Sequence, residues 1–160
     1  MTGLNHATTG ALISAAVVNP FLAVPVAFVS HFILDAIPHF GIKMSEDVFE
    51  RNRQKGVRLA VSAEAVISII ALVALPILIR PRVAWWVTLL TMLSAMFVDL
   101  IWIYRGIREE LTKKVKSKNW IMNFHLKASH HHSHFVFGIV FELAWFSAAL
   151  GVILWLVRNK

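Results

Sequence analysis

Three long apolar segments constrain this chain more than any other feature of its sequence. They cover residues 59–79, 83–104 and 135–157, and basic or aromatic residues bound each of them. A helix needs about 20 apolar residues to cross the hydrocarbon core of a bilayer. Hydrophobic residues make up 58% of the chain and charged residues 16%, whereas an average soluble domain carries about 25% charged residues. The sequence therefore predicts an all-α, polytopic integral membrane protein.

The first 40 residues contain two shorter apolar runs, which Asn19-Pro20 separates. The first run, 7–18, is too short to cross a bilayer alone, and two full spans here would require a thin membrane. Proline cannot continue a helix, so we expect a short helical hairpin over 1–40. The hairpin and the three spans form one predicted domain, 1–160. Because Met1 to His6 lacks the basic stretch of a secretory signal, we expect the whole chain to be mature.

Basic residues are unevenly distributed between the loops. Five of the 16 Lys and Arg residues lie in 43–58 and seven in 105–127, whereas the 80–82 turn and the C-terminal tail hold two each. The positive-inside rule predicts that the two long loops are cytoplasmic and the C-terminus is outside, in the plasma (inner) membrane. The net charge of +7 is then explained by anionic lipid headgroups rather than by nucleic acid. We expect 105–127 to lie on the membrane surface.

Four acidic residues lie inside the apolar segments, where an ionisable side chain costs a few kcal/mol. They are Asp35, Glu64, Asp99 and Glu142. A helical rise of about 1.5 Å per residue puts the last three roughly 8–12 Å inside their spans, all in the predicted cytoplasmic half. For Glu64, a structural hydrogen bond between helices is as well supported as a functional role. Asp99 has an alternative partner in Arg105 or a buried histidine.

Histidines are predicted at the same depth as these acids, and the chain contains eight of them. His31 and Asp35 are four residues apart and share one face of a helix, so both can hold one ion. Imidazole and carboxylate groups are the ligands of zinc, manganese and iron. A cation would also relieve the repulsion between acids in a medium of low dielectric constant. The cluster from His130 to His134 has a plainer interpretation as a patch that faces the headgroups and titrates with pH.

The sequence thus predicts a metal site on the cytoplasmic side, with zinc as the expected metal, manganese or iron as alternatives, and enough ligands for two ions. The expected ligands are His6, His31, Asp35, His39, Asp99, His125, His130, His131 and His134.

Several of these residues resemble the motifs of a known family. Asn5-His6-Ala-Thr-Thr-Gly10, the break at Pro20 and His31-x-x-x-Asp35-x-x-Pro38-His39 look like those of the bacterial and archaeal membrane-bound metal-dependent hydrolases. His132-Ser133 or His134 would supply a later histidine motif. The chain departs from the family in two places, where Asp-Ala-Ile-Pro-His and Lys-Ala-Ser-His-His-His replace its more compact motifs. The resemblance implies a metal-dependent hydrolase with a motif logic similar to that of zinc-dependent phospholipase C.

Our leading hypothesis is a membrane-embedded, metal-dependent hydrolase acting on a lipid or another amphiphile at the cytoplasmic leaflet, with a phosphoester as the expected bond. Glu64 or Glu142 would be the general base, and the other acid a ligand or an orienting group. The alternative is a metal-binding membrane protein or metal ion transporter, although nearly all polar groups lie in one half of the membrane. An oxidative di-iron enzyme is a weaker third hypothesis, because the Glu-x-x-His motif of carboxylate-bridged bundles is absent. Membrane lipids are the expected partners, and the oligomeric state is left open.

Overall fold

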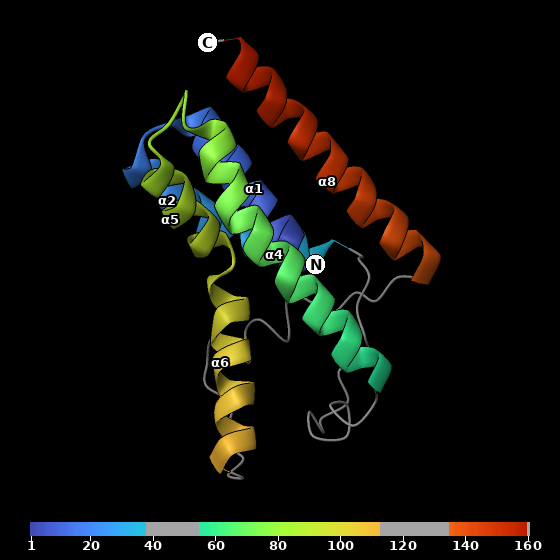
Figure 1. The fold of residues 1–160 in the computed structure, drawn as a ribbon. Coiled ribbons are helices and arrows are strands. Elements are labelled where there is room, and N and C mark those ends of the chain that lie inside the picture. Colours follow the sequence, from blue (N-terminus) through green and yellow to red (C-terminus); the bar gives the residue numbers. More distant parts are fainter. Residues whose placement is uncertain (38–54, 113–134, 160) are drawn as a thin grey trace.

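The computed structural model describes residues 1–37, 55–112 and 135–159, and all regular secondary structure in these ranges is helical (Figure 1). The helices are α1 (Gly3–Val17), α2 (Pro20–Ala36), α4 (Lys55–Ile79), α5 (Trp85–Ala95), α6 (Phe97–Thr112) and α8 (Phe135–Arg158). The expectation of an all-helical chain is confirmed for these ranges.

Two of these helices, over Val61–Ile79 and Val136–Arg158, are long and apolar enough to cross a membrane. The bent pair Trp85–Ala95 and Phe97–Arg105 provides a third span if the two parts are counted together. The outward faces of α4 and α8 carry many exposed aliphatic side chains, among them Ile70 and Val140. Faces of this kind are unfavourable in water but suit lipid tails. The described part of the chain is therefore that of a helical membrane protein.

The N-terminal hairpin turns at the expected position. Helix α1 ends at Val17, and Val18 has a φ of 61°. Asn19 then caps α2, because its side chain accepts a hydrogen bond from the backbone N–H of Phe21 at 2.9 Å. Pro20 follows as the first helical residue, where its missing N–H and fixed φ fit a helix start.

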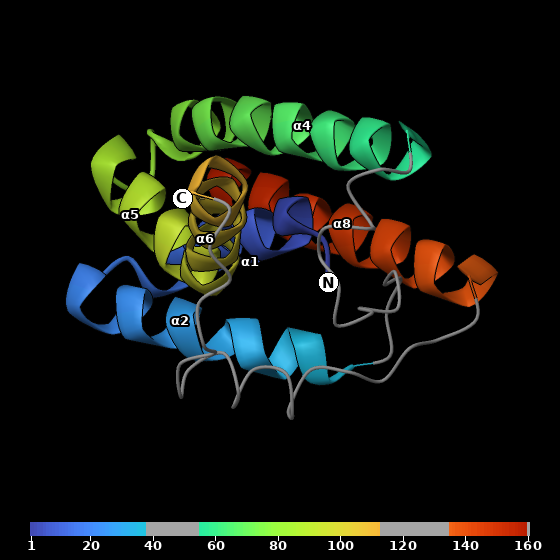
Figure 2. The same cartoon turned by 90° about the horizontal axis from the view of Figure 1, so that it is seen from below.

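Helix α1 is the central element, since it packs against α2, α4, α5 and α8 (Figure 2). Its buried residues are mostly small, and Ala7, Ala11 and Ala15 are completely buried. Small side chains let neighbouring backbones approach closely, as they do between helices in membranes. At Gly10 the approach is closest, because an added Cβ would lie 2.7 Å from Cα of Met92. The polar residues of α1 are consequently enclosed by four other helices.

The segment that we expected to form one span, 83–104, is not a single straight helix. Helix α5 ends at Ala95 and α6 starts at Phe97, and their axes differ by 62°. Figure 1 shows α6 leaving the bundle in a different direction. The break leaves the Ala95 carbonyl available to a side chain, and His31 Nδ1 donates to it at 2.9 Å. A contact with another helix thus stabilises a break for which the local sequence contains neither proline nor glycine.

Candidate metal centre

Two buried histidines from the N-terminal hairpin form the base of the site. His6 lies in the second turn of α1 and His31 near the end of α2, and both are 0% exposed. Their rings stack with centroids 4.1 Å apart and an angle of 26° between the ring planes. Because α1 and α2 form one hairpin, the tight turn at Val18 and Asn19 aligns the two histidines.

Asp35 links the two imidazoles. Its Oδ2 lies 3.2 Å from Nε2 of His31, and its Oδ1 lies 3.0 Å from Nε2 of His6. The amino group of Met1 also donates to Oδ1 of Asp35, at 2.5 Å. The expectation that His31 and Asp35 share one helix face is confirmed.

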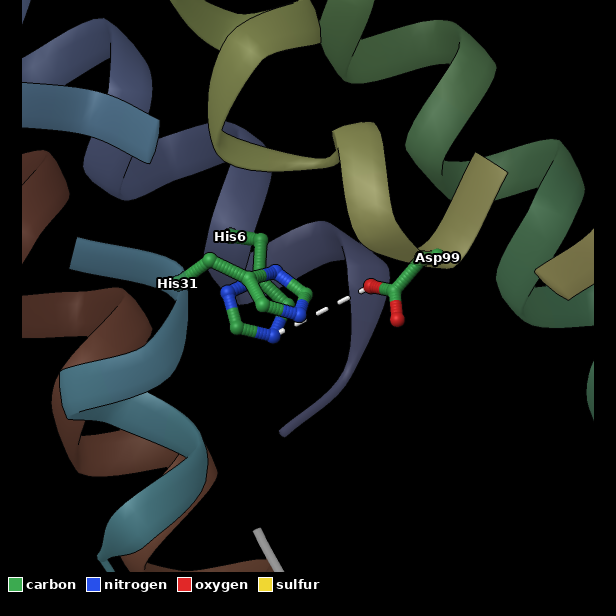
Figure 3. Close-up of side chains that lie close together, drawn as sticks. All are labelled: His6, His31 and Asp99. Carbon is green, nitrogen blue, oxygen red and sulfur yellow. Dashed lines mark ion pairs between the residues drawn. The ribbon is translucent and has the colours of Figure 1, made fainter. Parts of the chain in front are cut away.

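Asp99 completes the group from the other side. It lies in the first turn of α6, directly after the break at Met96. Its Oδ2 is 3.9 Å from Nε2 of His6, and Figure 3 shows this carboxylate facing the two stacked rings. One ligand atom each from His6, His31 and Asp99 lies within 4.8 Å of the others. Three helices therefore contribute one potential metal ligand each.

The hydrogen bonds define the chemical state of the His31 ring. A backbone carbonyl can only accept, so Nδ1 of His31 must carry the proton that it donates to Ala95. In the neutral ring, Nε2 then presents a lone pair, and a carboxylate oxygen of Asp35 lies 3.2 Å away. Two acceptors at this distance require a proton or a cation between or beside them. Nε2 of His31 and the Asp35 carboxylate therefore form a site that favours a bound proton or cation.

Further acceptors point to the same requirement. Nδ1 of His6 and Oδ2 of Asp99 are buried and have no hydrogen-bond partner among the described residues. Buried polar atoms rarely stay without a partner unless an ion or a water is bound there. Two imidazoles and one carboxylate form a ligand set known from catalytic zinc sites and from non-haem iron sites. Ligand atoms around a tetrahedral zinc lie about 3.3 Å apart, so small side-chain movements would bring this group to that spacing. The donor set fits a divalent transition metal.

The other two intramembrane acids contact α1 but do not belong to this ligand group. Oε1 of Glu64 on α4 accepts the backbone N–H of Gly3 at 2.5 Å, in the first turn of α1. Oε2 of Glu142 on α8 accepts from Nδ2 of Asn5 at 3.4 Å. These are hydrogen bonds between helices, the plainer of the two interpretations that we gave for Glu64. Their predicted role in catalysis stays a prediction.

The remaining predicted ligands, His39, His125, His130, His131 and His134, lie outside the described residues.

Two features of the site were not predicted from the sequence. The first is Asn5, whose amide joins α1 to α8 beside the centre. A signal for it exists, since an Asn next to a His in an apolar helix is unusual and needs partners. The second is the Ala95 carbonyl that orients His31. A backbone group has no signal of this kind, because only the tertiary fold decides which carbonyl becomes available.

Comparison of the chain with known proteins identifies no related protein. No protein-family model, curated protein or solved structure matches the chain. The candidate centre therefore depends on its own geometry, and the resemblance to membrane-bound hydrolases remains a hypothesis based on motifs.

Proposed function

We propose that the protein binds a divalent transition metal inside the membrane through His6, His31 and Asp99. The observation that carries this proposal is the convergence, within 4.8 Å, of one ligand atom each from two buried histidines and from the partly buried Asp99. Asp35 supports the group by accepting from His6 Nε2 at 3.0 Å, and the Ala95 carbonyl holds His31 in one tautomer. Outer groups of this kind orient metal ligands in characterised sites. Zinc is the metal we expect, with manganese or iron as alternatives.

We further propose that the centre serves a metal-dependent hydrolase acting on a lipid-like amphiphile, with a phosphoester as the expected bond. The three ligands found among the described residues match the three protein ligands of catalytic zinc sites, which keep a fourth position for water or substrate. When bound, the ion supplies a Lewis acid that activates water and stabilises negative charge. The apolar faces around the site favour an amphiphile as substrate, and Glu64 and Glu142 are the proposed bases. The motifs shared with membrane-bound metal-dependent hydrolases support the same function, at the cytoplasmic leaflet of the plasma membrane.

Two matched substitutions test both proposals. Asp99→Asn and Glu64→Gln each neutralise one intramembrane carboxyl group with little change of shape, but only Asp99 belongs to the ligand group. We expect purified Asp99→Asn to lose most of its metal in elemental analysis, whereas Glu64→Gln keeps stoichiometric metal. If both variants kept their metal, the proposed metal centre would be contradicted.

The same proteins, loaded with zinc in detergent, separate a hydrolase from a transporter. Wild type should cleave a phosphoester or ester lipid without any gradient, and Asp99→Asn should be inactive. If Glu64 is the general base, Glu64→Gln should lose about 10²–10⁴ in rate while holding metal, and otherwise Glu142→Gln should show this behaviour. No cleavage of any ester lipid, together with zinc uptake into sealed vesicles, would replace the hydrolase with a transporter.

A further inference from the structure

A cavity of about 480 Å³ lies between α1, α4 and α8, and it opens on the outer surface of the bundle, where Ile67 is 49% and Leu143 62% exposed. This volume is within the usual range of small-molecule sites, about 300–1,000 Å³. Its apolar walls consist of Leu4, Ala63, Ile67, Ile139, Leu143 and Phe146. The metal ligand group does not line it, so the cavity is a separate feature of the molecule.

The polar lining comes from the start of α1 and from the two acids that face it. Thr2 and Asn5 lie on one side, and Glu64 and Glu142 belong to α4 and α8. Asn5 is 2% exposed and Glu142 is 7% exposed, so both side chains are more than nine-tenths buried. The cavity therefore combines long apolar walls with a small group of buried polar atoms.

Two of these polar atoms are acceptors without a donor among the described residues, although the carboxyl group of Glu142 also interacts with Thr2. Nδ2 of Asn5 lies 3.2 Å from the backbone oxygen and 3.4 Å from Oε2 of Glu142. Both neighbours accept hydrogen bonds, so the amide must turn its NH₂ group toward them and its Oδ1 away. Oδ1 of Asn5 and Oε1 of Glu142 then have no hydrogen-bond partner among the described residues. Each such atom costs about 1–3 kcal/mol unless a bound molecule donates to it.

We propose that this cavity binds an amphiphile with a hydrocarbon chain and a primary ammonium group. The walls suit the chain, because both are apolar, and the selectivity for the ligand must come from its polar head. An ammonium group has three donors and no acceptor, which matches the carboxylates and the amide oxygen. An anionic head would be repelled by the two acids, and a hydroxyl would lack the charge that strengthens hydrogen bonds to them. The proposal does not require the metal ion, but it uses Glu64 and Glu142, the two acids that the proposed hydrolase would use as bases, and it gives them a cationic ligand instead of a phosphoester.

Photolabelling tests the proposal. The full chain is reconstituted in phosphatidylcholine nanodiscs at pH 7 with hexadecylamine that carries a diazirine on its chain. Crosslinks mapped by mass spectrometry should concentrate at Ile139 and Phe146, which line the cavity and are less exposed than Ile67 and Leu143. The alcohol and the sulfate with the same chain should label these residues at least about tenfold less. Equal labelling by all three probes would overturn the recognition of an ammonium group.

Variants of the same protein provide the controls. Ala63→Trp fills the cavity and should abolish labelling of its walls, whereas Ala74→Trp, on the outer face of the same helix, should leave the labelling unchanged. Glu142→Gln should weaken labelling by the amine about tenfold but not labelling by the alcohol, because only the charged head loses its partner. Labelling that persists in Ala63→Trp, or that spreads over the outer faces of α4 and α8, would show that the probe is bound as bulk lipid and contradict the site.

Discussion

At the scale of single residues, Asp35 is the group on which the two histidines depend. It contacts His31 at 3.2 Å, His6 at 3.0 Å and the amino group of Met1 at 2.5 Å, and it is 3% exposed. Four polar groups of the N-terminal hairpin, including the amino group of Met1 just before α1, thus meet where little solvent reaches them. Replacing Asp35 removes the one acceptor that the other three groups share, and His31 then keeps only its bond to the Ala95 carbonyl among the contacts described above.

We therefore predict that Asp35→Ala strongly destabilises the protein and removes its metal. Each buried polar group that loses its partner costs about 1–3 kcal/mol, and two imidazoles are affected. Thermal unfolding in detergent and elemental analysis measure the two effects. Ser30→Ala is the control on the same helix, because its hydroxyl bonds only to the carbonyl of Ala27 in its own helix, and it should change neither quantity. An Asp35→Ala protein as stable and as rich in metal as Ser30→Ala would remove Asp35 from the centre.

The residues also show what the sequence could reveal about the site. The pair His31 and Asp35 was predictable because both lie on one helix, where spacing alone determines which side chains share a face. The meeting of Asp99 with His6 was not, since it depends on the direction in which α6 leaves the break at Met96. The sequence named His6, His31 and Asp99 among nine expected ligands and gave Glu64 and Glu142 a different role as candidate bases, but it could not show which of the nine meet.

At the scale of elements, the packing of α1 on α5 requires a residue without a side chain at position 10. An added Cβ would lie 2.7 Å from Cα of Met92 and 2.8 Å from the carbonyl oxygen of Thr91. Both are backbone atoms, so one helix would have to move. Ser14 of α1 bonds Thr88 of α5 at 2.9 Å one turn further along, and a shift of either helix would strain that contact as well.

We predict that Gly10→Ala lowers the stability by about 1–3 kcal/mol, the usual cost of overpacking a core. The matched control is Gly151→Ala in α8, where an added Cβ meets nothing within 4 Å. That substitution should be neutral or slightly stabilising, because alanine is the better helix former. Thermal unfolding of the two variants side by side measures the difference. Equal behaviour of both would mean that α1 and α5 do not pack as described.

The sequence predicted those helix boundaries that depend on neighbouring residues, and it missed the boundary that depends on a tertiary contact. The turn between α1 and α2 was found because Asn19-Pro20 is a local stop and start signal. The apolar segments at 59–79 and 135–157 correspond closely to α4 and α8. The division of 83–104 into two helices was missed. His31 donates a hydrogen bond to the Ala95 carbonyl at this break, and the two residues are 64 positions apart in the sequence. The same missed break gives α6 the direction that brings Asp99 to the site.

At the scale of the whole molecule, Arg82 shows which helix ends lie together. Its Nε donates to the carbonyl of Ala15 at 2.6 Å, and its Nη1 donates to the carbonyl of Leu156 at 3.1 Å. The turn after α4 is thus joined to the C-terminal ends of α1 and α8. Basic side chains at helix C-termini also interact favourably with the helix dipoles. The 80–82 turn and the end of the chain therefore belong to one end of the bundle.

This shared end leads to our prediction for the arrangement in the membrane. The chain contains no cysteine, so single cysteines can be introduced without further changes. We expect Arg80→Cys and Asn159→Cys to react together with a membrane-impermeant maleimide added to intact cells, because both positions are exposed at that end. Glu50→Cys and Lys116→Cys, in the loops richest in Lys and Arg, should react only after permeabilisation. Arg80 is used instead of Arg82, whose guanidinium holds two helix ends in place.

The reverse labelling pattern would move the metal centre to the outer leaflet. Labelling of Arg80→Cys and Asn159→Cys from opposite sides would contradict the helix arrangement itself, since Arg82 joins the two ends.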